Sequence, residues 1–238
     1  MTTETMVSSW NDILPKVNNT GIYHQLREQF LYYEIFQEKF IAPVDEQLLL
    51  SWYKKIKEDL QLAFSLFSIE KLHYIPFTVV FPENILLLKD LMYEINLTNK
   101  DGIISTEVSK NAKMFLDDYN TDIFPYLIFA TDISNRYKYQ GDEYKATMEH
   151  FDKIKYRHRS LILREALSVA LLQPEYFHSR FRGLQIGGST IRPKNDSTDS
   201  NVFIYRLGTG NNARLRIETI GDFFYDEEFP IPTTCILV

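Results

Sequence analysis

The sequence predicts an α+β fold: a mixed sheet with one buried helix, preceded by an antiparallel pair of N-terminal helices. Three observations lead to this prediction. Apolar residues recur at three- and four-residue steps over 22–41 and 45–67, as they do on one face of a helix. Short β-branched and aromatic runs bounded by Pro or Gly follow, as in strands. The run 160–172 is apolar except for a narrow polar strip, which is typical of a buried helix.

The two N-terminal helices have the clearest periodicity. The apolar face of the first consists of Ile22, Leu26, Phe30, Tyr33, Phe36 and Phe40, and that of the second of Leu49, Trp52, Tyr53, Ile56, Leu60, Ala63, Phe64 and Phe67. Pro43 ends the first helix, and Asp45 is placed to cap the second. Because the turn between them is short, we expect them to pack antiparallel. The helical segment covers 1–68 and the α+β part 69–238, as one continuous folding unit.

Strands and helices then mix without strict alternation, which favours α+β over a doubly wound sheet. Asn84 is placed to cap a helix. The expected strands are 75–81, 103–104, 125–133, 184–186, 202–207 and 213–219, and the expected helices are 85–95, 106–117 and 142–151.

A set of co-linear positions supports the same fold. They are Pro76, Phe77 and Pro82; Tyr126, Asp132 and Arg136; Ser160, Glu165, Ala166, Leu167, Pro174 and Glu175; and Leu184, Gly188 and Ser189. In these positions the chain, over about residues 70–218, resembles the bacterial family catalogued as domain of unknown function 5701. It departs from that family at Ala166, where the family has Gly, in a longer 193–201 loop, and in its tail. The resemblance implies a fold and no activity.

Composition limits the compartment and the class of protein. The N-terminus lacks the basic start and apolar core of a secretory signal, and no apolar run has the length of a membrane span. Cys235 is the only cysteine, which excludes an internal disulfide and a CxxC site. We therefore expect a protein of the cytoplasm, or alternatively a translocated bacterial effector without a cleaved signal peptide.

Charge is distributed unevenly along the chain. The formal net charge is −6, yet residues 151–220 contain 12 Lys and Arg against 6 Asp and Glu. Nine of the eleven arginines lie in this stretch: Arg157, Arg159, Arg164, Arg180, Arg182, Arg192, Arg206, Arg214 and Arg216. Arginine suits phosphate and carboxylate through its planar fork. The stretch therefore indicates contact with an anionic group.

Patterns for metal, cofactor and nucleophilic chemistry are weak. The five histidines form no metal-binding pair, no G-x-S-x-G elbow exists, and no histidine is near Cys235 in sequence. The carboxylates of 117–122 lack the glycine and distant glutamate of a calcium loop, so a turn is favoured there. The glycines of 187–190 lack a Walker lysine, which favours a β-turn or bulge. We expect no catalytic residues, metal or cofactor.

The candidate site for an anion or a partner consists of Arg157, Arg159, Arg180, Arg182 and Arg192. Interleaved aromatic residues are also found in proteins that bind single-stranded nucleic acid. Overall acidity argues against binding to duplex nucleic acid, which depends on phosphate neutralisation. The alternative is a solvated surface whose arginines pair with the acidic remainder of the chain.

The tail, an acidic block at 226–228 before an apolar end, allows three interpretations. It can be a terminal strand, which we favour, a C-a-a-X lipidation signal at Cys235, or a loose C-terminal signal of the kind found on type IV secretion substrates. The sequence leaves the oligomeric state open.

These observations favour a non-enzymatic binding or interaction protein whose partner, a protein or a small anionic ligand, contacts the arginine-rich C-terminal half. The rival hypothesis is an enzyme acting on a phosphorylated or nucleotide-like small molecule. A deep pocket that combines arginines with a carboxylate or histidine would favour the enzyme. An apolar patch rimmed by arginines would favour the interaction protein.

Overall fold

The protein has an α+β fold, as the sequence predicts. The computed structural model describes residues 9–18, 21–66, 77–92, 105–108, 112–117, 123–130, 156–172, 183–193, 200–207, 214–219 and 233–237. The helices are α1 (Trp10–Ile13), α2 (Ile22–Tyr33), the 3-10 helix η1 (Glu34–Lys39), α3 (Glu46–Leu66) and α6 (Leu163–Leu172). The strands are β1 (Phe77–Val80), β2 (Ser105–Val108), β3 (Ala112–Asp117), β4 (Tyr126–Ala130), β5 (Tyr156–Ser160), β6 (Gly183–Pro193), β7 (Ser200–Leu207), β8 (Arg214–Thr219) and β9 (Thr233–Leu237).

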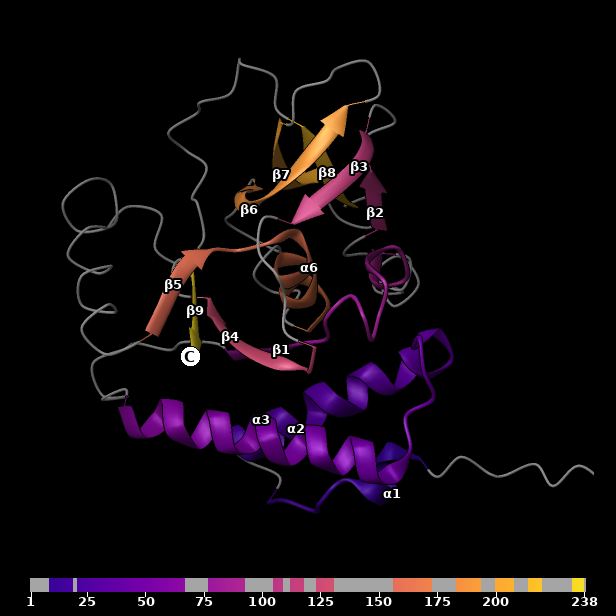
Figure 1. Ribbon diagram of the computed structural model, residues 1–238, viewed down its shortest axis with the longest axis vertical. Helices are drawn as coiled ribbons and strands as arrows, with labels where there is room; N and C mark the ends of the chain where they lie inside the picture. Colours follow the sequence, from indigo (N-terminus) through magenta and orange to yellow (C-terminus); the bar gives the residue numbers. More distant parts are fainter. Residues whose placement is uncertain are drawn as a thin grey trace, which may run out of the picture.

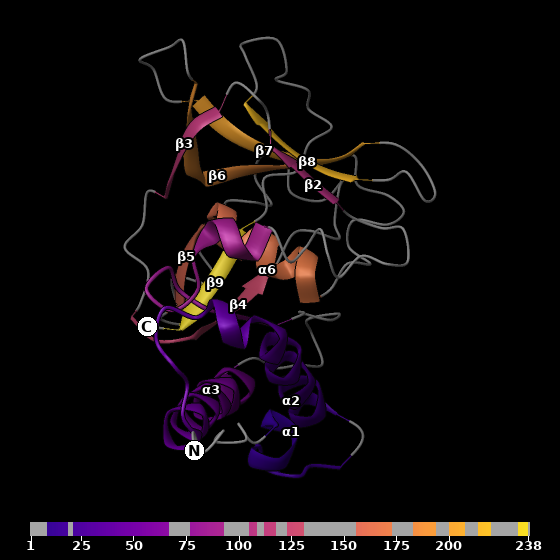
Figure 2. The ribbon, with the colours of Figure 1, turned by 90° about the vertical axis from the view of Figure 1, so that its right-hand side faces the viewer.

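These elements are stacked in layers (Figures 1 and 2). Helices α1, α2 and α3 form a layer at one end of the molecule. Next comes a four-stranded sheet in the order β1-β4-β9-β5, and at the other end a five-stranded sheet in the order β2-β8-β7-β6-β3. Helix α6 lies between the two sheets and contacts both β1 and β6.

The described strands thus form two sheets, where the sequence predicts one mixed sheet. The four-stranded sheet is antiparallel throughout. The five-stranded sheet is mixed, because β2 runs parallel to β8 while its other neighbours are antiparallel. Residue patterns identify strands but not their partners, which is why the division into two sheets is not visible in the sequence.

The helical layer follows from the apolar stripes of α2 and α3. Leu26, Phe30 and Tyr33 of α2 are buried, as are six residues of α3: Leu49, Trp52, Tyr53, Ile56, Leu60 and Ala63. Asp45 caps α3 as predicted, since its Oδ1 accepts a hydrogen bond from the Leu48 N–H at 2.8 Å. The predicted helix at 22–41 is α-helical only to Tyr33 and then tightens into η1, which ends at Lys39.

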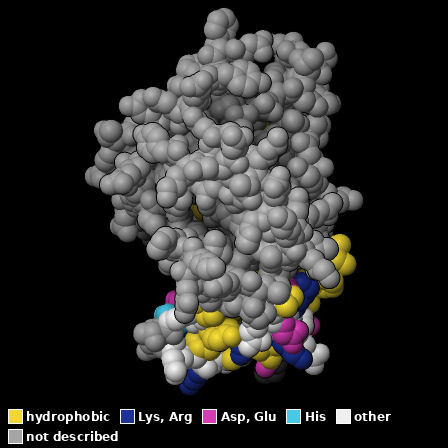
Figure 3. All heavy atoms as spheres, turned by 90° about the vertical axis from the view of Figure 1, so that its left-hand side faces the viewer, with side chains coloured by type: hydrophobic (Ala, Val, Ile, Leu, Met, Phe, Trp, Pro, Cys, Tyr) yellow, Lys and Arg dark blue, Asp and Glu magenta, His cyan; other side chains and the backbone are white. Residues whose placement is uncertain are grey.

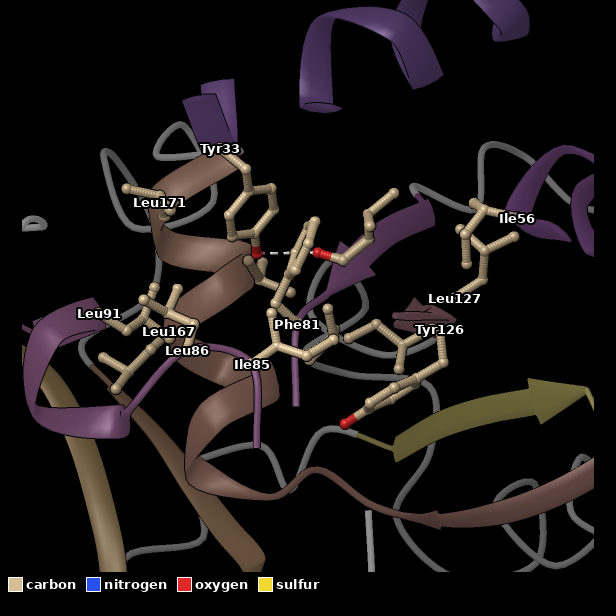
Figure 4. Close-up of a cluster of buried hydrophobic side chains, with 14 of the residues drawn as sticks. Tyr33, Ile56, Phe81, Ile85, Leu86, Leu91, Tyr126, Leu127, Leu167 and Leu171 are labelled. Carbon is tan, nitrogen blue, oxygen red and sulfur yellow. Dashed lines mark hydrogen bonds between the residues drawn. The ribbon is translucent and has the colours of Figure 1, made fainter. Parts of the chain in front are cut away.

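The four-stranded sheet has one face towards the helices and one towards α6. Phe77 and Val79 of β1 lie opposite Phe129 and Leu127 of β4, and Leu127 is shown beside Ile56 of α3 in Figure 4. Tyr126, the residue before Leu127, lies on the other face of the sheet, and its hydroxyl donates a hydrogen bond to Glu165 of α6. The C-terminal residues form β9, between β4 and β5, so the terminal-strand interpretation of the tail is confirmed. Cys235 lies inside this strand.

The five-stranded sheet contains one correction to the sequence prediction. Residues 106–117 are predicted as a helix, but 105–108 and 112–117 are the strands β2 and β3. Their ladder partners, β8 and β6, lie far away in sequence, and such tertiary pairing overrides local helix propensity. The predicted turn or bulge in 187–190 is confirmed, because the register of β6 against β7 shifts between Ile186 and Thr190.

One core joins these layers. Among the described residues, all the buried apolar side chains except Ile162 form one cluster that extends from Trp10 in α1 to Ile217 in β8. Leu163, Leu167 and Leu171 of α6 belong to it and are all buried. Figure 4 shows Leu167 beside Leu86 and Leu91, which follow β1. The core therefore does not divide at the boundary between residues 68 and 69.

Candidate functional site

A buried arginine dominates the polar chemistry of the described interior. Arg164, in the first turn of α6, is fully buried. Its Nη1 donates hydrogen bonds to the carbonyl oxygens of Phe81, at 2.9 Å, and Leu86, at 2.6 Å, and its Nη2 pairs with the Glu83 carboxylate. Burial lowers the pKa of Arg164 to about 10, against a smaller opposing effect of Tyr33. The guanidinium thus ties α6 to the chain that follows β1.

Glu165, next to it, is buried and joins three elements. Its Oε1 accepts a hydrogen bond from the Tyr126 hydroxyl of β4 at 3.0 Å, and its Oε2 accepts one from the Ile162 N–H at 3.0 Å. The second bond closes the N-terminus of α6 in the manner of a capping box. Ser189 of β6 accepts a hydrogen bond from the Leu163 N–H at 2.6 Å. These bonds anchor the start of α6 to both sheets.

Tyr33 completes this buried network from the helical layer. Its hydroxyl donates a hydrogen bond to the Val79 carbonyl at 2.9 Å, drawn in Figure 4. Burial raises the pKa of Tyr33 well above its ordinary value, although Ser168 and Arg164 act in the opposite direction. The phenol therefore remains protonated at neutral pH and acts as a hydrogen-bond donor. The contacts of Tyr33, Arg164 and Glu165 connect structural elements, so we assign this network to the architecture of the fold.

The five arginines predicted as a site are only partly brought together. Arg157 and Arg159 lie two positions apart on β5 and so share one face of that strand. Arg192 lies on β6, in the other sheet. Arg180 and Arg182 are outside the described residues.

The cross-strand neighbours of Arg157 and Arg159 are uncharged. Arg157 lies opposite Ile236 and Arg159 opposite Thr234, both on β9. Directly opposite residues in an antiparallel pair are the closest contacts across a sheet, so neither arginine has an acidic partner at that position.

A second arginine pair lies on the five-stranded sheet, on β8. Arg214 and Arg216 alternate with the buried Ile217, so they belong to the face of this sheet opposite to its buried residues. Arg216 lies opposite Glu107 of β2, and a carboxylate at that position offers it a cross-strand partner. The sequence does not indicate this neighbour of Arg216, because residues 106–117, which include Glu107, are predicted as a helix.

The two edges of the four-stranded sheet differ. At the β1 edge, Gln29 of α2 donates from Nε2 to the Phe77 carbonyl at 2.9 Å and accepts from the Val79 N–H at 2.8 Å through Oε1. Together with Tyr33, Gln29 replaces the hydrogen bonds of a neighbouring strand. At the other end of the strand order stands β5, which carries Arg157, His158 and Arg159. One edge is therefore closed by side chains, and the other is basic.

The register also brings His158 and Cys235 together. His158 on β5 lies directly opposite Cys235 on β9. The sequence gives no signal for this pair, because 77 residues separate the two positions and only the strand pairing joins them. No histidine is therefore near Cys235 in sequence.

Further surface features are unspecific. Figure 3 shows hydrophobic side chains among charged ones over the helical layer, and Tyr32, Ile35 and Leu62 there are exposed. Scattered apolar side chains are common on protein surfaces. Within the described ranges, no three His, Cys, Asp or Glu side chains are grouped so that they could hold a metal ion. The described helices include none with the length and apolar character needed to cross a membrane.

Comparisons with known proteins give no relative. No family model matches the chain, and no match is found among curated proteins or solved structures. The resemblance to the family of unknown function 5701 therefore remains an expectation from the sequence.

Proposed function

We propose that the chain is a non-enzymatic interaction protein that binds an acidic, extended segment of a partner protein along β5. Arg157 and Arg159 supply the charge that selects the segment. The edge strand supplies the backbone groups with which an added strand pairs, a common mode of peptide recognition.

The single observation that carries this proposal is the contrast between the two sheet edges. Gln29 and Tyr33 close the β1 edge with three hydrogen bonds. The β5 edge instead carries two arginines whose opposite neighbours are uncharged. Basic residues on an edge strand also prevent unwanted pairing with other strands. Their positive charge repels basic strands and disfavours the approach of apolar ones. The same charge attracts an acidic segment.

The helices that pack on β1 and β4 of the same sheet suit this role. We infer that α2 and α3 form the antiparallel pair expected from the sequence. Lys57 of α3 lies over the ring of Tyr23, 5.1 Å from its centroid, while Tyr53 contacts Phe30 edge-on with ring centroids 5.4 Å apart. Residue numbers therefore rise along α2 as they fall along α3. With buried α6 on the opposite face, this pair fixes the position of the sheet, and a preformed edge reduces the entropy cost of binding.

A charge-reversal experiment tests the proposal. Fluorescence anisotropy measures the binding of a labelled polyglutamate peptide to the wild type and to the double variant Arg157→Glu/Arg159→Glu. Loss of two charge-assisted contacts, at about 1.5–3 kcal/mol each, is expected to weaken binding at least about tenfold. The matched control is Arg214→Glu/Arg216→Glu, which changes net charge equally and has the same two-residue spacing on the other sheet. It should bind nearly as well as the wild type.

Three outcomes would contradict the proposal: no binding by the folded wild type, equal loss in both double variants, or equally tight binding of polylysine. Equal loss would mean that the peptide senses net charge and not the β5 edge. Circular dichroism of each variant shows whether the fold is retained.

The compartment belongs to the same proposal. We place the protein in a reducing cytoplasm, with translocation as a bacterial effector as the alternative. The support is its single cysteine, which permits no internal disulfide. Fusion to a reporter that is active only after transfer into a host cell separates the two.

A further inference from the structure

Arg27 of α2 has one buried N–H that lacks a hydrogen-bond acceptor. Its Nη2 donates to the backbone oxygen of Asn11 on α1, at 2.9 Å, and to the side-chain Oδ1 of Asn11, at 2.6 Å. Its Nη1 lies 3.7 Å from a carboxylate oxygen of Glu28, whose side chain is exposed. The Nε atom is buried and has no hydrogen-bond partner. The guanidinium is thus tied to α1 through Nη2, while its Nε–H remains an unpaired donor.

Contacts with α3 lie on both sides of Arg27. One turn before it, Tyr23 lies beneath Lys57 of α3, whose Nζ is 5.1 Å from the ring centroid. One turn after it, Phe30 contacts Tyr53 of α3 edge-on, with ring centroids 5.4 Å apart. Residues three and four apart share one face of a helix, so Arg27 is on the face of α2 that packs against α3. The guanidinium therefore lies where α1, α2 and α3 come together (Figure 2).

Tyr53 supplies a second buried donor without an acceptor. The residue is 2% exposed, and its hydroxyl oxygen has no hydrogen-bond partner. Burial raises the pKa of Tyr53, whereas Arg27 lowers it and Tyr23 raises it, so both neighbours interact with the phenol. The phenol is protonated at neutral pH and can donate a hydrogen bond. Buried donors without an acceptor cost stability, so two of them in one place favour the binding of a group that accepts from both.

The charges around these donors indicate the kind of group that fits. Arg27 and Lys57 are cations, and Glu28 is the carboxylate that approaches Arg27. Together these three side chains have a formal balance of one positive charge. A carboxylate has one negative charge and oxygen atoms that only accept hydrogen bonds, so it matches both the charge and the donors. A phosphate group would add more negative charge than this balance offsets.

We propose that α2 and α3 form a binding site for the carboxylate group of a small molecule, held by Arg27 and Tyr53. One carboxylate oxygen accepts hydrogen bonds from the Arg27 Nε–H and from the Tyr53 hydroxyl. Hydrogen bonds to an ionised acceptor are stronger than those between neutral groups. The half-buried Lys57 has a flexible stem, so it can leave the ring of Tyr23 to admit the ligand and then face its charge. This site lies in the helical layer and does not depend on the β5 edge.

An NMR titration of the full chain tests the proposal. The Nε–H of Arg27 gives its own signal in a proton–nitrogen correlation spectrum of isotope-labelled protein, and its loss in Arg27→Lys identifies it. Sodium acetate is the probe, and sodium chloride keeps the ionic strength constant, so that charge screening does not change. The Arg27 Nε–H signal should shift as acetate is added and then reach a plateau. Sodium chloride alone should leave it in place.

Three variants locate the site. Tyr53→Phe removes one donor and keeps the ring, and it should weaken acetate binding at least about tenfold, as expected for a hydrogen bond to a charged group. Because the hydroxyl has no acceptor in the structure, Tyr53→Phe should keep or raise the urea midpoint measured without acetate. Lys57→Gln should also weaken binding. Lys54→Gln, the matched change at an exposed position of α3, should not.

Four results would overturn the proposal. A signal that moves equally in chloride and in acetate would mean that no carboxylate binds here. Equal acetate affinity in the wild type and in Tyr53→Phe would place the ligand elsewhere. A lower urea midpoint of Tyr53→Phe without acetate would show that ordered water already satisfies the hydroxyl. Tighter binding of inorganic phosphate than of acetate would contradict the choice of a carboxylate.

Discussion

Arg164 is the residue whose environment departs most from what its type ordinarily prefers. Arginine is almost never fully buried unless it is paired, and here two carbonyls and one carboxylate pair with its terminal nitrogens, while its Nε has no hydrogen-bond partner. The carbonyls belong to Phe81 and Leu86, which follow β1, and Leu86 also forms an isolated antiparallel bridge with Phe40. The arginine thus serves as a buried connector, which is why the count of nine arginines in the C-terminal half overstates the charge available for binding.

Replacement of Arg164 should therefore destabilise the fold strongly. Arg164→Met leaves two buried carbonyl groups without a donor, and we expect a loss of ~3–5 kcal/mol in the free energy of unfolding. The matched change Glu83→Gln removes only the charge of a partner whose side chain is 55% exposed, and should cost ~0–1 kcal/mol. Urea denaturation measures both. Equal losses would show that the ion pair, and not the carbonyl contacts, stabilises this region.

For single residues, the sequence predicts the structural role correctly where that role depends on neighbours a few positions away in the chain. Asp45 is recognised as a cap because its partner, Leu48, is three residues away. Arg164 is recognised only as part of a polar strip on α6, because its carbonyl partners lie about 80 positions earlier. The pairing of His158 with Cys235 depends on strand register, which no local pattern specifies.

Among the elements, α2 has a second role besides packing. Its apolar stripe covers the four-stranded sheet, and Gln29 and Tyr33 on the same helix bond to the backbone of β1. A buried glutamine on an apolar helix face is costly unless both ends of its amide are bonded, and here both are.

Gln29 should consequently matter far more than an exposed glutamine on a helix. Gln29→Leu keeps the volume but leaves the Phe77 carbonyl and the Val79 N–H without partners, so we expect a loss of ~2–4 kcal/mol. Gln61→Leu, on the exposed side of α3, is the matched control and should stay within about 0.5 kcal/mol of the wild type. Both values come from thermal and urea unfolding. A neutral Gln29→Leu would mean that water can replace the amide at this edge.

The elements themselves are predicted unevenly from the sequence. Helix α3 and strands β1, β4, β7 and β8 lie close to their expected positions, because their periodic or β-branched patterns are strong. Residues 106–117 are wrongly predicted as a helix, since Ala112, Lys113 and Met114 have good helix propensity. Their strand partners on β6 supply hydrogen bonds that outweigh it.

The described layers share one core, although the chain changes from helical to mostly β after α3. Phe81, just after β1, shows how this is achieved. Its ring contacts Phe30, Tyr33, Phe40 and Trp52, with centroid distances from 4.2 to 6.1 Å. The helical layer is therefore completed by a residue of the α+β part, and neither part has an apolar core of its own at this contact.

We accordingly expect the two parts to unfold together. Both tryptophans, Trp10 and Trp52, are buried in the helical layer, and the single cysteine, Cys235, is in β9. Tryptophan fluorescence and pulsed alkylation of Cys235 should therefore give the same urea midpoint, as in a two-state transition. Two separated midpoints would instead show that residues 1–68 and 69–238 fold independently.

The position of β9 has a consequence for the order in which the chain folds. Strands β4 and β5 lie in one sheet only because β9 separates and pairs with both, and Phe129 and Cys235, which face each other, are 106 residues apart in sequence. Closing so long a loop costs conformational entropy before the strand contacts can form and offset that cost. Contacts between residues far apart in sequence therefore make folding slow. The helical layer and the β6–β7–β8 meander depend on much more local contacts. Strand β5 is therefore among the last parts of the protein to find its partner, and a chain that stalls before this step retains two unpaired strands that are prone to aggregate.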